Sequence, residues 1–236
     1  MDAERSNAEP SGKQEILHVS PFADLPGPSR EAVLDLGRLE RIPRRHRLAE
    51  QGEPPRGLFL IGAGRVKLER FTAARAFPLG HRGPGQLVGE TAVAGVPGST
   101  ETATVLDDAE GLSLPIAGFR KLLACDAAVR AAMAAALVHI HQATEARLVG
   151  LLLYGVETRL VRFLLDVGAR WGRPHEGGEL ISAPFTHADM ALLIGSTRET
   201  VTLLLGKLKR GGLISFDRRR VVMRDRAALE RHAETL

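Results

Sequence analysis

The spacing of apolar residues changes along this chain, and the changes divide it into one extended and two helical regions. From about Glu40 to Pro115, short apolar runs are interrupted by glycine and proline, which is typical of a small antiparallel barrel or jelly roll. We expect the runs LFLI and VKLERF to pair as a tight hairpin around residues 62–64. From Pro115 to Leu153 the spacing becomes helical, whereas the polar residues 1–15 are expected to be disordered.

Residues 186–213 have the spacing of two short helices joined by a tight turn. Thr186 and Asp189 match a capping box, Gly195 ends the first helix, and Ser196 or Thr197 starts the second. The second helix places four apolar residues on one face: Val201, Leu204, Leu205 and Leu208. The pattern favours a DNA-binding helix-turn-helix over an ordinary helical hairpin in a core.

Three residues in the first turns of the second helix lie off this apolar stripe and are expected to face solvent: Arg198, Glu199 and Thr202. An arginine forks onto guanine O6 and N7, while a glutamate accepts a hydrogen bond from cytosine N4. A carboxylate that faces phosphates is electrostatically costly, so Glu199 indicates the reading of sequence rather than nonspecific adhesion. We therefore expect a G·C step in the half-site.

The segment after the second helix, GGLIS followed by FDRRRVVMR, predicts a turn and a two-stranded wing. Three arginines form its tip, where a winged helix meets backbone phosphates: Arg218, Arg219 and Arg220. The net charge of +4 arises wholly after residue 154, and residues 196–226 hold nine Lys and Arg against three Asp and Glu. This local excess is typical of a nucleic-acid footprint.

Residues 125–153 carry a stripe with spacings of three and four, as in a coiled-coil seam. The stripe consists of Met133, Leu137, Ile140, Thr144, Leu148 and Leu151. The alternative is a helix that packs only on its own barrel. We favour a dimer seam, because one helix-turn-helix covers too little DNA, and two-fold pairing matches palindromic half-sites.

Composition excludes several classes of protein. The longest apolar stretches are too short to cross a membrane and no apolar signal segment is present, so we expect a cytoplasmic protein without a membrane partner. Cys125 is the single cysteine, which excludes an intramolecular disulfide and a cysteine-ligated iron-sulfur cluster. The candidates for catalysis, Glu90, Glu101 and His81, form no catalytic motif or metal-ligand spacing, so neither an enzyme nor a metal site is expected.

A barrel, a long helix, a break near Tyr154 and a winged helix-turn-helix resemble, in that order, the CRP/FNR family of bacterial transcription regulators. Three motifs carry the resemblance over about residues 22–226: EQGEPPRGLFLIGAGRVKL, GQLVGE and LLIGSTRETVTLLLGKL. The resemblance implies a homodimer that binds a small effector, binds a palindromic site in double-stranded DNA and contacts RNA polymerase.

The expected fold is α+β, with an N-terminal β-roll or jelly-roll barrel, a long dimerisation helix and a C-terminal winged helix-turn-helix. We expect a disordered tail at 1–15, an effector-sensing β-roll at 16–124, the dimerisation helix at 125–153 and the DNA-binding domain at 154–236.

Family roles transfer to individual residues of the helix-turn-helix. Arg198 and Glu199 coincide with the family's base-reading pair, whereas its second base-reading arginine is replaced by Leu203, which can touch a thymine methyl. We therefore expect a half-site related to, but different from, that of the cyclic-AMP-responsive members. Base readout is assigned to Arg198, Glu199, Thr202 and Leu203, and phosphate contact to Thr186, Thr197, Lys207, Arg218, Arg219 and Arg220.

The resemblance also places an effector pocket at Gly89, Glu90, Glu101, Thr102 and Thr144. In the cyclic-nucleotide-binding members a glutamate like Glu90 holds the ribose, and an arginine about ten residues later pairs with the phosphate. Here Thr100 or Glu101 stands at that arginine position. A phosphate beside Glu101 would meet a repulsion of about 4 kcal/mol, where an arginine would give an attraction of similar size. Cyclic AMP is therefore not expected.

The sequence leaves the effector unidentified. A heme-based gas or redox sensor is one alternative, with His81, His139 and His141 as the candidate axial ligands. None of the three matches the ligand position that we associate with the carbon-monoxide-sensing members. A neutral or cationic effector is a second alternative. A third is an architectural DNA-binding protein without any effector, in which the barrel is only a dimer scaffold.

Overall fold

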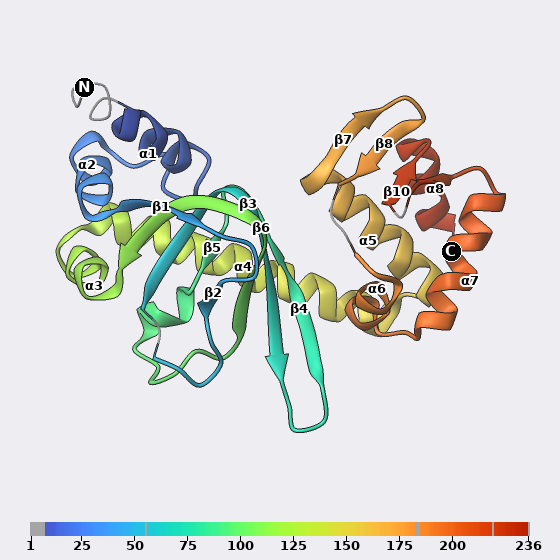
Figure 1. Cartoon of the computed structure of the whole chain (residues 1–236), viewed down its shortest axis with the longest axis horizontal. Helices are drawn as coiled ribbons and strands as arrows, with labels where there is room; N and C mark the ends of the chain where they lie inside the picture. The colour runs from blue at the N-terminus through green and yellow to red at the C-terminus, as the bar shows by residue number, and fades with distance from the viewer. Residues whose placement is uncertain (1–7, 55, 183–184, 219, 236) are drawn as a thin grey trace. The chain divides into compact units, whose positions relative to one another are not determined.

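The computed structural model describes residues 8–54, 56–182, 185–218 and 220–235 of the chain. Contacts divide the chain into two compact units, Met1–Gln142 and Ala143–Leu236. The division falls inside a long helix rather than after residue 153, because the carboxyl end of that helix packs with the second unit. Figure 1 shows the elements of both units.

The first unit is built on a six-stranded antiparallel sheet, in agreement with the expected β-rich half. Its strands follow the order β1-β6-β3-β4, with β2 paired to β6 and β5 paired to β3 (Figure 1). The strands are β1 Arg38–Ile42, β2 Arg47–Ala49, β3 Gly57–Phe71, β4 Ala76–Arg82, β5 Leu87–Val88 and β6 Thr102–Pro115. A short 3₁₀ helix, η1 Glu90–Ala94, follows β5.

The hairpin predicted at residues 62–64 is wrong, because strand β3 continues through them without a turn. Its pairing with β6 shifts register between Ile61 and Ala63 and again beyond Ala63, so these residues form bulges. Gly64 has a φ of 86°, and a Cβ there would lie 2.7 Å from the carbonyl oxygen of Asp108. The glycines therefore bend one long strand, and the hairpin turn comes later, between β3 and β4.

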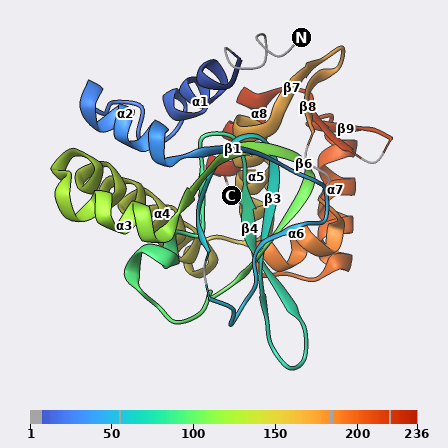
Figure 2. The same ribbon diagram turned by 60° about the vertical axis from the view of Figure 1, so that its left-hand side comes forward.

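Two helices that the pattern did not predict precede the sheet: α1 Ala8–His18 and α2 Gly27–Leu36. The expectation of disorder through residue 15 is therefore wrong from Ala8 onward. Ile16 and Leu17, near the end of α1, are 6% and 1% exposed and belong to the core of the first unit. Figure 2 shows α1 and α2 beside each other, next to β1.

Asp126 separates the next two helices, α3 Ile116–Cys125 and α4 Ala127–Leu153. Its Oδ1 accepts hydrogen bonds from the backbone N–H groups of Ala128, at 2.9 Å, and Val129, at 3.1 Å, so it caps the start of α4. No single helix among the described residues has the length and hydropathy of a membrane span. Helices α3 and α4 have them only as a pair, bent by 114°.

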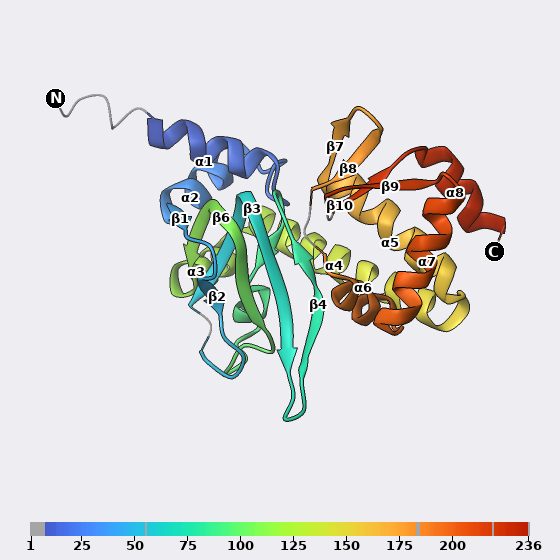
Figure 3. The same ribbon diagram turned by 45° about the vertical axis from the view of Figure 1, so that its right-hand side comes forward.

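The second unit continues from the end of α4 with four helices and a small sheet of order β7-β8-β10-β9 (Figure 3). Its elements are α5 Val156–Trp171, β7 Gly172–His175, β8 Gly178–Ile181, α6 His187–Ile194, α7 Arg198–Arg210, β9 Ile214–Asp217, β10 Arg220–Met223 and α8 Arg226–Thr235. Strands β9 and β10 confirm the predicted wing, which β7 and β8 extend.

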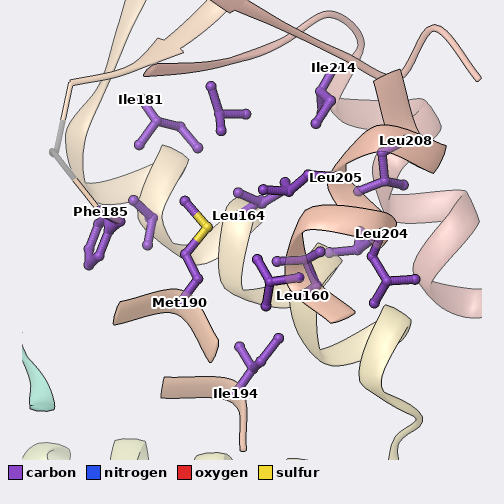
Figure 4. Packing of buried hydrophobic residues seen from close by; sticks show 14 of the residues in the cluster. Leu160, Leu164, Ile181, Phe185, Met190, Ile194, Leu204, Leu205, Leu208 and Ile214 are labelled. Carbon is purple, nitrogen blue, oxygen red and sulfur yellow. The ribbon is translucent and has the colours of Figure 1, made fainter. Parts of the chain in front are cut away.

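Leucines and other apolar side chains from α5, α6 and α7 converge in the core of the second unit (Figure 4). The residues labelled there are Leu160, Leu164, Ile181, Phe185, Met190, Ile194, Leu204, Leu205, Leu208 and Ile214. Burying each leucine contributes about 1.5–3 kcal/mol. This core fixes α7 on α5 and α6, so the opposite side of α7 is presented on a rigid support.

Candidate nucleic-acid interface and ligand pocket

Helix α7 has one buried face and one exposed face. The stripe predicted from the sequence is confirmed: its members are 8% exposed or less, and they are Val201, Leu204, Leu205 and Leu208. Arg198 and Glu199 lie in the first turn and are exposed. Leu203 is 67% exposed, which is unusual for a large apolar side chain. The structure therefore presents a cation, a carboxylate and an apolar group together at the start of one helix.

The first helix of the helix-turn-helix is capped by Thr186, as predicted, and the second by Thr197 rather than Ser196. Thr186 accepts a hydrogen bond from the N–H of Asp189 at 3.0 Å, and the Asp189 carboxylate accepts one from the Thr186 N–H at 3.1 Å. This reciprocal pair is the predicted capping box. Thr197 caps α7 by accepting from the N–H of Thr200 at 3.2 Å. Capping therefore engages the hydroxyl oxygens of both threonines. Any contact with a DNA phosphate must use the hydrogen-bonding capacity that remains.

Thr202 is exposed as expected, but its hydroxyl is already engaged. It donates to the carbonyl oxygen of Arg198 at 2.9 Å, so Nδ1 of His187, 2.8 Å away, must donate to it. The Thr202 methyl group remains for contact with a base. His187, in the first turn of α6, is a residue of this surface that the sequence pattern did not reveal, because its partner lies on the other helix.

Lys207 also has a partner that was not foreseen. Its Nζ lies 2.6 Å from Glu157 in the first turn of α5, and Nε2 of His232 in α8 lies 2.9 Å from the same carboxylate. Burial alone would raise the pKa of Glu157, but the hydrogen bonds and positive charges of Lys207 and His232 lower it. These interactions connect α7 to α5 and α8. They also partly neutralise the charge of Lys207, which was predicted to contact a DNA phosphate.

The arginines at the tip of the wing differ in their surroundings. Arg218 is exposed in the turn after β9, with a φ of 56°. Arg220, the first residue of β10, lies 3.4 Å from Asp217. Arg219, also predicted to contact phosphate, lies outside the described residues.

In the first unit, Gly89 and Glu90, which were predicted to line an effector pocket, lie where β5 meets η1, and Thr102 begins β6. Gly89 has a φ of 86°, and a Cβ there would lie 2.4 Å from the carbonyl oxygen of Gly57, so this position admits only glycine. Glu90 follows it, with 11% of its side chain exposed. Thr102 is buried and its hydroxyl accepts from the N–H of Gln51 at 3.1 Å.

A cation that was not predicted at this site lies beside Glu90. Arg82, the last residue of β4, lies 3.5 Å from Glu90 and its side chain is 17% exposed. The family resemblance places an arginine downstream of Glu90, whereas the strand order brings this one from upstream. Arg82 Nε and Glu90 Oε2 are buried and have no hydrogen-bond partner among the described residues.

Glu101 adds a second carboxylate to the same pocket. Burial raises its pKa and the charge of Glu90 raises it further, while Arg82 and Arg70 oppose the shift. Arg82 is thus already paired with Glu90, and the charges of both side chains act on Glu101.

The remaining pocket and heme candidates lie apart along the chain. Thr144 is exposed and belongs to the second unit, whereas the other predicted pocket residues belong to the first. His81 on β4 is 9% exposed, while His139 and His141 are exposed on α4. Within the described ranges, no group of three or more His, Cys, Asp or Glu side chains is suited to a metal ion.

The members of the predicted seam on α4 differ in their burial within one chain. Met133 is only 2% exposed and packs with Val129 and Ala136 in the core of its own unit, so the alternative of a helix on its own barrel holds there. Further along the stripe, Leu137 is 39% and Leu148 is 56% exposed. Ile140 is half-buried, Thr144 is exposed and Leu151 is 37% exposed.

Known proteins match both halves of the chain. A model of the Crp-like helix-turn-helix domain matches residues 158–232, and a model of the cyclic nucleotide-binding domain matches residues 39–126. The chain is 31% identical over 200 residues to the transcriptional regulator LdrP of Thermus thermophilus, which covers 83% of this chain and 96% of that protein. It is 27% identical over 193 residues to a CRP-like cAMP-activated global transcriptional regulator of Mycobacterium tuberculosis, covering 81% and 86% of the two. A solved CRP-family transcriptional regulator from Thermus thermophilus superposes with a TM-score of 0.70 at 26% identity, over 83% of this chain and 96% of that one.

Proposed function

Because the chain belongs to the CRP/FNR family of transcription regulators, we propose that it acts as a homodimer that reads a palindromic DNA site with α7. In this proposal the barrel responds to an effector other than cyclic AMP, and the DNA-bound dimer contacts RNA polymerase. The sequence-specific step belongs to the first turn of α7.

The observation that carries this proposal is the exposure of Arg198 and Glu199 at the start of a helix whose other face is buried. A guanidinium in that place reads guanine, and a carboxylate there would repel phosphates if it did not face a base. The basic residues at the wing supply contacts that position the protein without reading sequence. Base readout is therefore assigned to Arg198, Glu199, the Thr202 methyl and Leu203.

The test is selection of sites from random double-stranded DNA, followed by titration of two variants. Arg198→Ala should lose about 1–3 kcal/mol at a selected site and relax the preference at one G·C position. The matched control, Arg218→Ala, should weaken binding to all sequences alike and reduce its salt dependence. Equal losses for both variants on selected and scrambled DNA would rule out direct readout by Arg198.

The partner proposed for α4 is a second copy of this chain. Beyond Met133, the helix exposes two adjacent apolar stripes along its length. They consist of Leu137, Val138, Leu148, Val149, Leu151 and Leu152. Within each stripe these side chains are three or eleven residues apart, which is about one or three helical turns, so they lie in line and are suited to contact with a second helix.

The effector proposal follows from the charges of the pocket. The relative from Mycobacterium tuberculosis is named as activated by cAMP, but here Arg82 is paired with Glu90, and Thr100 or Glu101 stands where the resemblance places a cation. We therefore propose a neutral or cationic effector. Small-molecule binding to the purified full chain, measured by mass spectrometry under native conditions, tests this directly: a retained anionic nucleotide would contradict it.

A further inference from the structure

The carboxyl end of α6 is capped twice, by its own backbone and by two arginines. Gly195 adopts the left-handed conformation, and the N–H groups of Gly195 and Ser196 bond to Leu192 and Ala191, at 3.5 Å and 2.8 Å. This is a Schellman motif, and it leaves the next carbonyl groups without backbone partners.

Those next three carbonyl groups are the ones that the two arginines bind. Arg147 Nε donates to the Leu193 oxygen at 3.2 Å, and Arg159 Nε donates to the Ile194 oxygen at 2.8 Å. Arg159 also donates to the Gly195 oxygen at 3.2 Å. Positive charge at this end of a helix is favoured by the helix dipole.

Arg159 reaches a second helix end at the same time. Its other terminal nitrogen donates to the carbonyl oxygens of Tyr154, at 2.6 Å, and Leu151, at 3.3 Å, where α4 finishes. One planar guanidinium, itself in the first turn of α5, thus binds the ends of both α4 and α6. A lysine has a single nitrogen and cannot bridge them in this way.

These contacts lie entirely within the second unit, since the end of α4 belongs to it. Helix α7 begins at Arg198, three positions after Gly195, so whatever fixes the end of α6 also fixes the base-reading residues. The two arginines therefore connect α6 by hydrogen bonds to α4, the helix proposed to form the dimer contact.

Building on the proposed function, we infer that Arg147 and Arg159 form a clamp that positions the helix-turn-helix on the end of α4. Through this clamp, specific DNA binding depends on the position of the carboxyl end of α4. Arg147 and Arg159 are positioning residues: they need not touch DNA, and their effect is exerted through the orientation of Arg198.

The test compares Arg159→Lys with Arg170→Lys in the full-length protein. Both variants keep the charge on α5, but Arg170 bonds to Asp166 on its own helix. We expect Arg159→Lys to weaken binding to the selected DNA about tenfold, with nonspecific binding unchanged, since only the precise placement of α7 is lost. Hydrogen exchange should become faster in peptides covering residues 150–154 and 193–197, and Arg170→Lys should match the wild type in both measurements.

If Arg159→Lys does not fold, Arg147→Lys serves the same purpose, because it leaves Arg159 in place and weakens the contact with Leu193. If the tested variant, Arg159→Lys or its substitute Arg147→Lys, keeps the DNA specificity and hydrogen exchange of the wild type, the clamp is overturned. That result would leave the proposed function intact. Failure of the wild type to prefer any selected site would refute the proposed function, and hydrogen exchange would still report on the clamp.

Discussion

At the scale of single residues, Leu203 distinguishes this recognition helix from the family pattern. Its side chain is 67% exposed, so Leu203→Arg should change the free energy of unfolding by less than about 0.5 kcal/mol. The new guanidinium should add a guanine preference of about 1–3 kcal/mol at one position of the half-site. Repeating site selection with the variant checks this, and an unchanged preferred sequence would show that Leu203 does not face the bases.

Glu157 makes stability depend on pH through a single carboxylate. Its pKa in the folded chain is lowered from 4.5, so its contribution is complete above that value and is lost as the pH falls through the lower, folded pKa. Glu157→Gln should therefore lower the melting temperature at neutral pH, and the difference from wild type should shrink in acid. Asp166→Asn, which removes an exposed ion pair from the same helix, should show little difference at any pH. A constant gap between wild type and Glu157→Gln would contradict this account.

At the scale of helices and strands, the sequence predicted best what local interactions determine. The starts of α6 and α7 were placed correctly because Thr186, Asp189 and Thr197 cap within one turn of their own helices. The course of β3 through Gly64 was missed, since its bulges exist only in pairing with β6. Arg82 was missed for the same reason: strand order, rather than sequence distance, brings it to Glu90.

Helix α4 combines a core segment with an exposed segment, and truncation separates them. Met133→Ala should cost about 2–5 kcal/mol of unfolding free energy, because the side chain is 2% exposed in the core of the first unit. Leu148→Ala removes a side chain that is 56% exposed, so it should cost far less in the monomer. Chemical denaturation of both variants at low protein concentration measures the difference. Equal costs would mean that Leu148 is also part of a core within one chain.

At the scale of the whole molecule, the dimer should depend on the exposed stripe of α4. Leu148→Glu should produce monomers and abolish binding to the palindromic site, because it places a charge in an apolar contact. Ala146→Glu adds the same charge to an exposed position on the opposite side of the helix and should remain dimeric. Analytical ultracentrifugation and DNA titration decide between them, and a dimeric Leu148→Glu variant would place the contact elsewhere.

The charges at the predicted effector site differ from the family pattern, and this difference predicts how DNA binding responds to cyclic AMP. Cyclic AMP should leave the DNA affinity of the wild type unchanged, because its phosphate would face Glu101 while Arg82 stays paired with Glu90. Glu101→Arg should replace a repulsion of about 4 kcal/mol by an attraction of similar size. Calorimetry should then detect cyclic AMP binding to Glu101→Arg, but not to the wild type or to Glu40→Arg, which reverses an exposed charge on β1. Tight binding of cyclic AMP to the wild type would contradict this account, because Arg82 would then have to leave Glu90 to meet the phosphate.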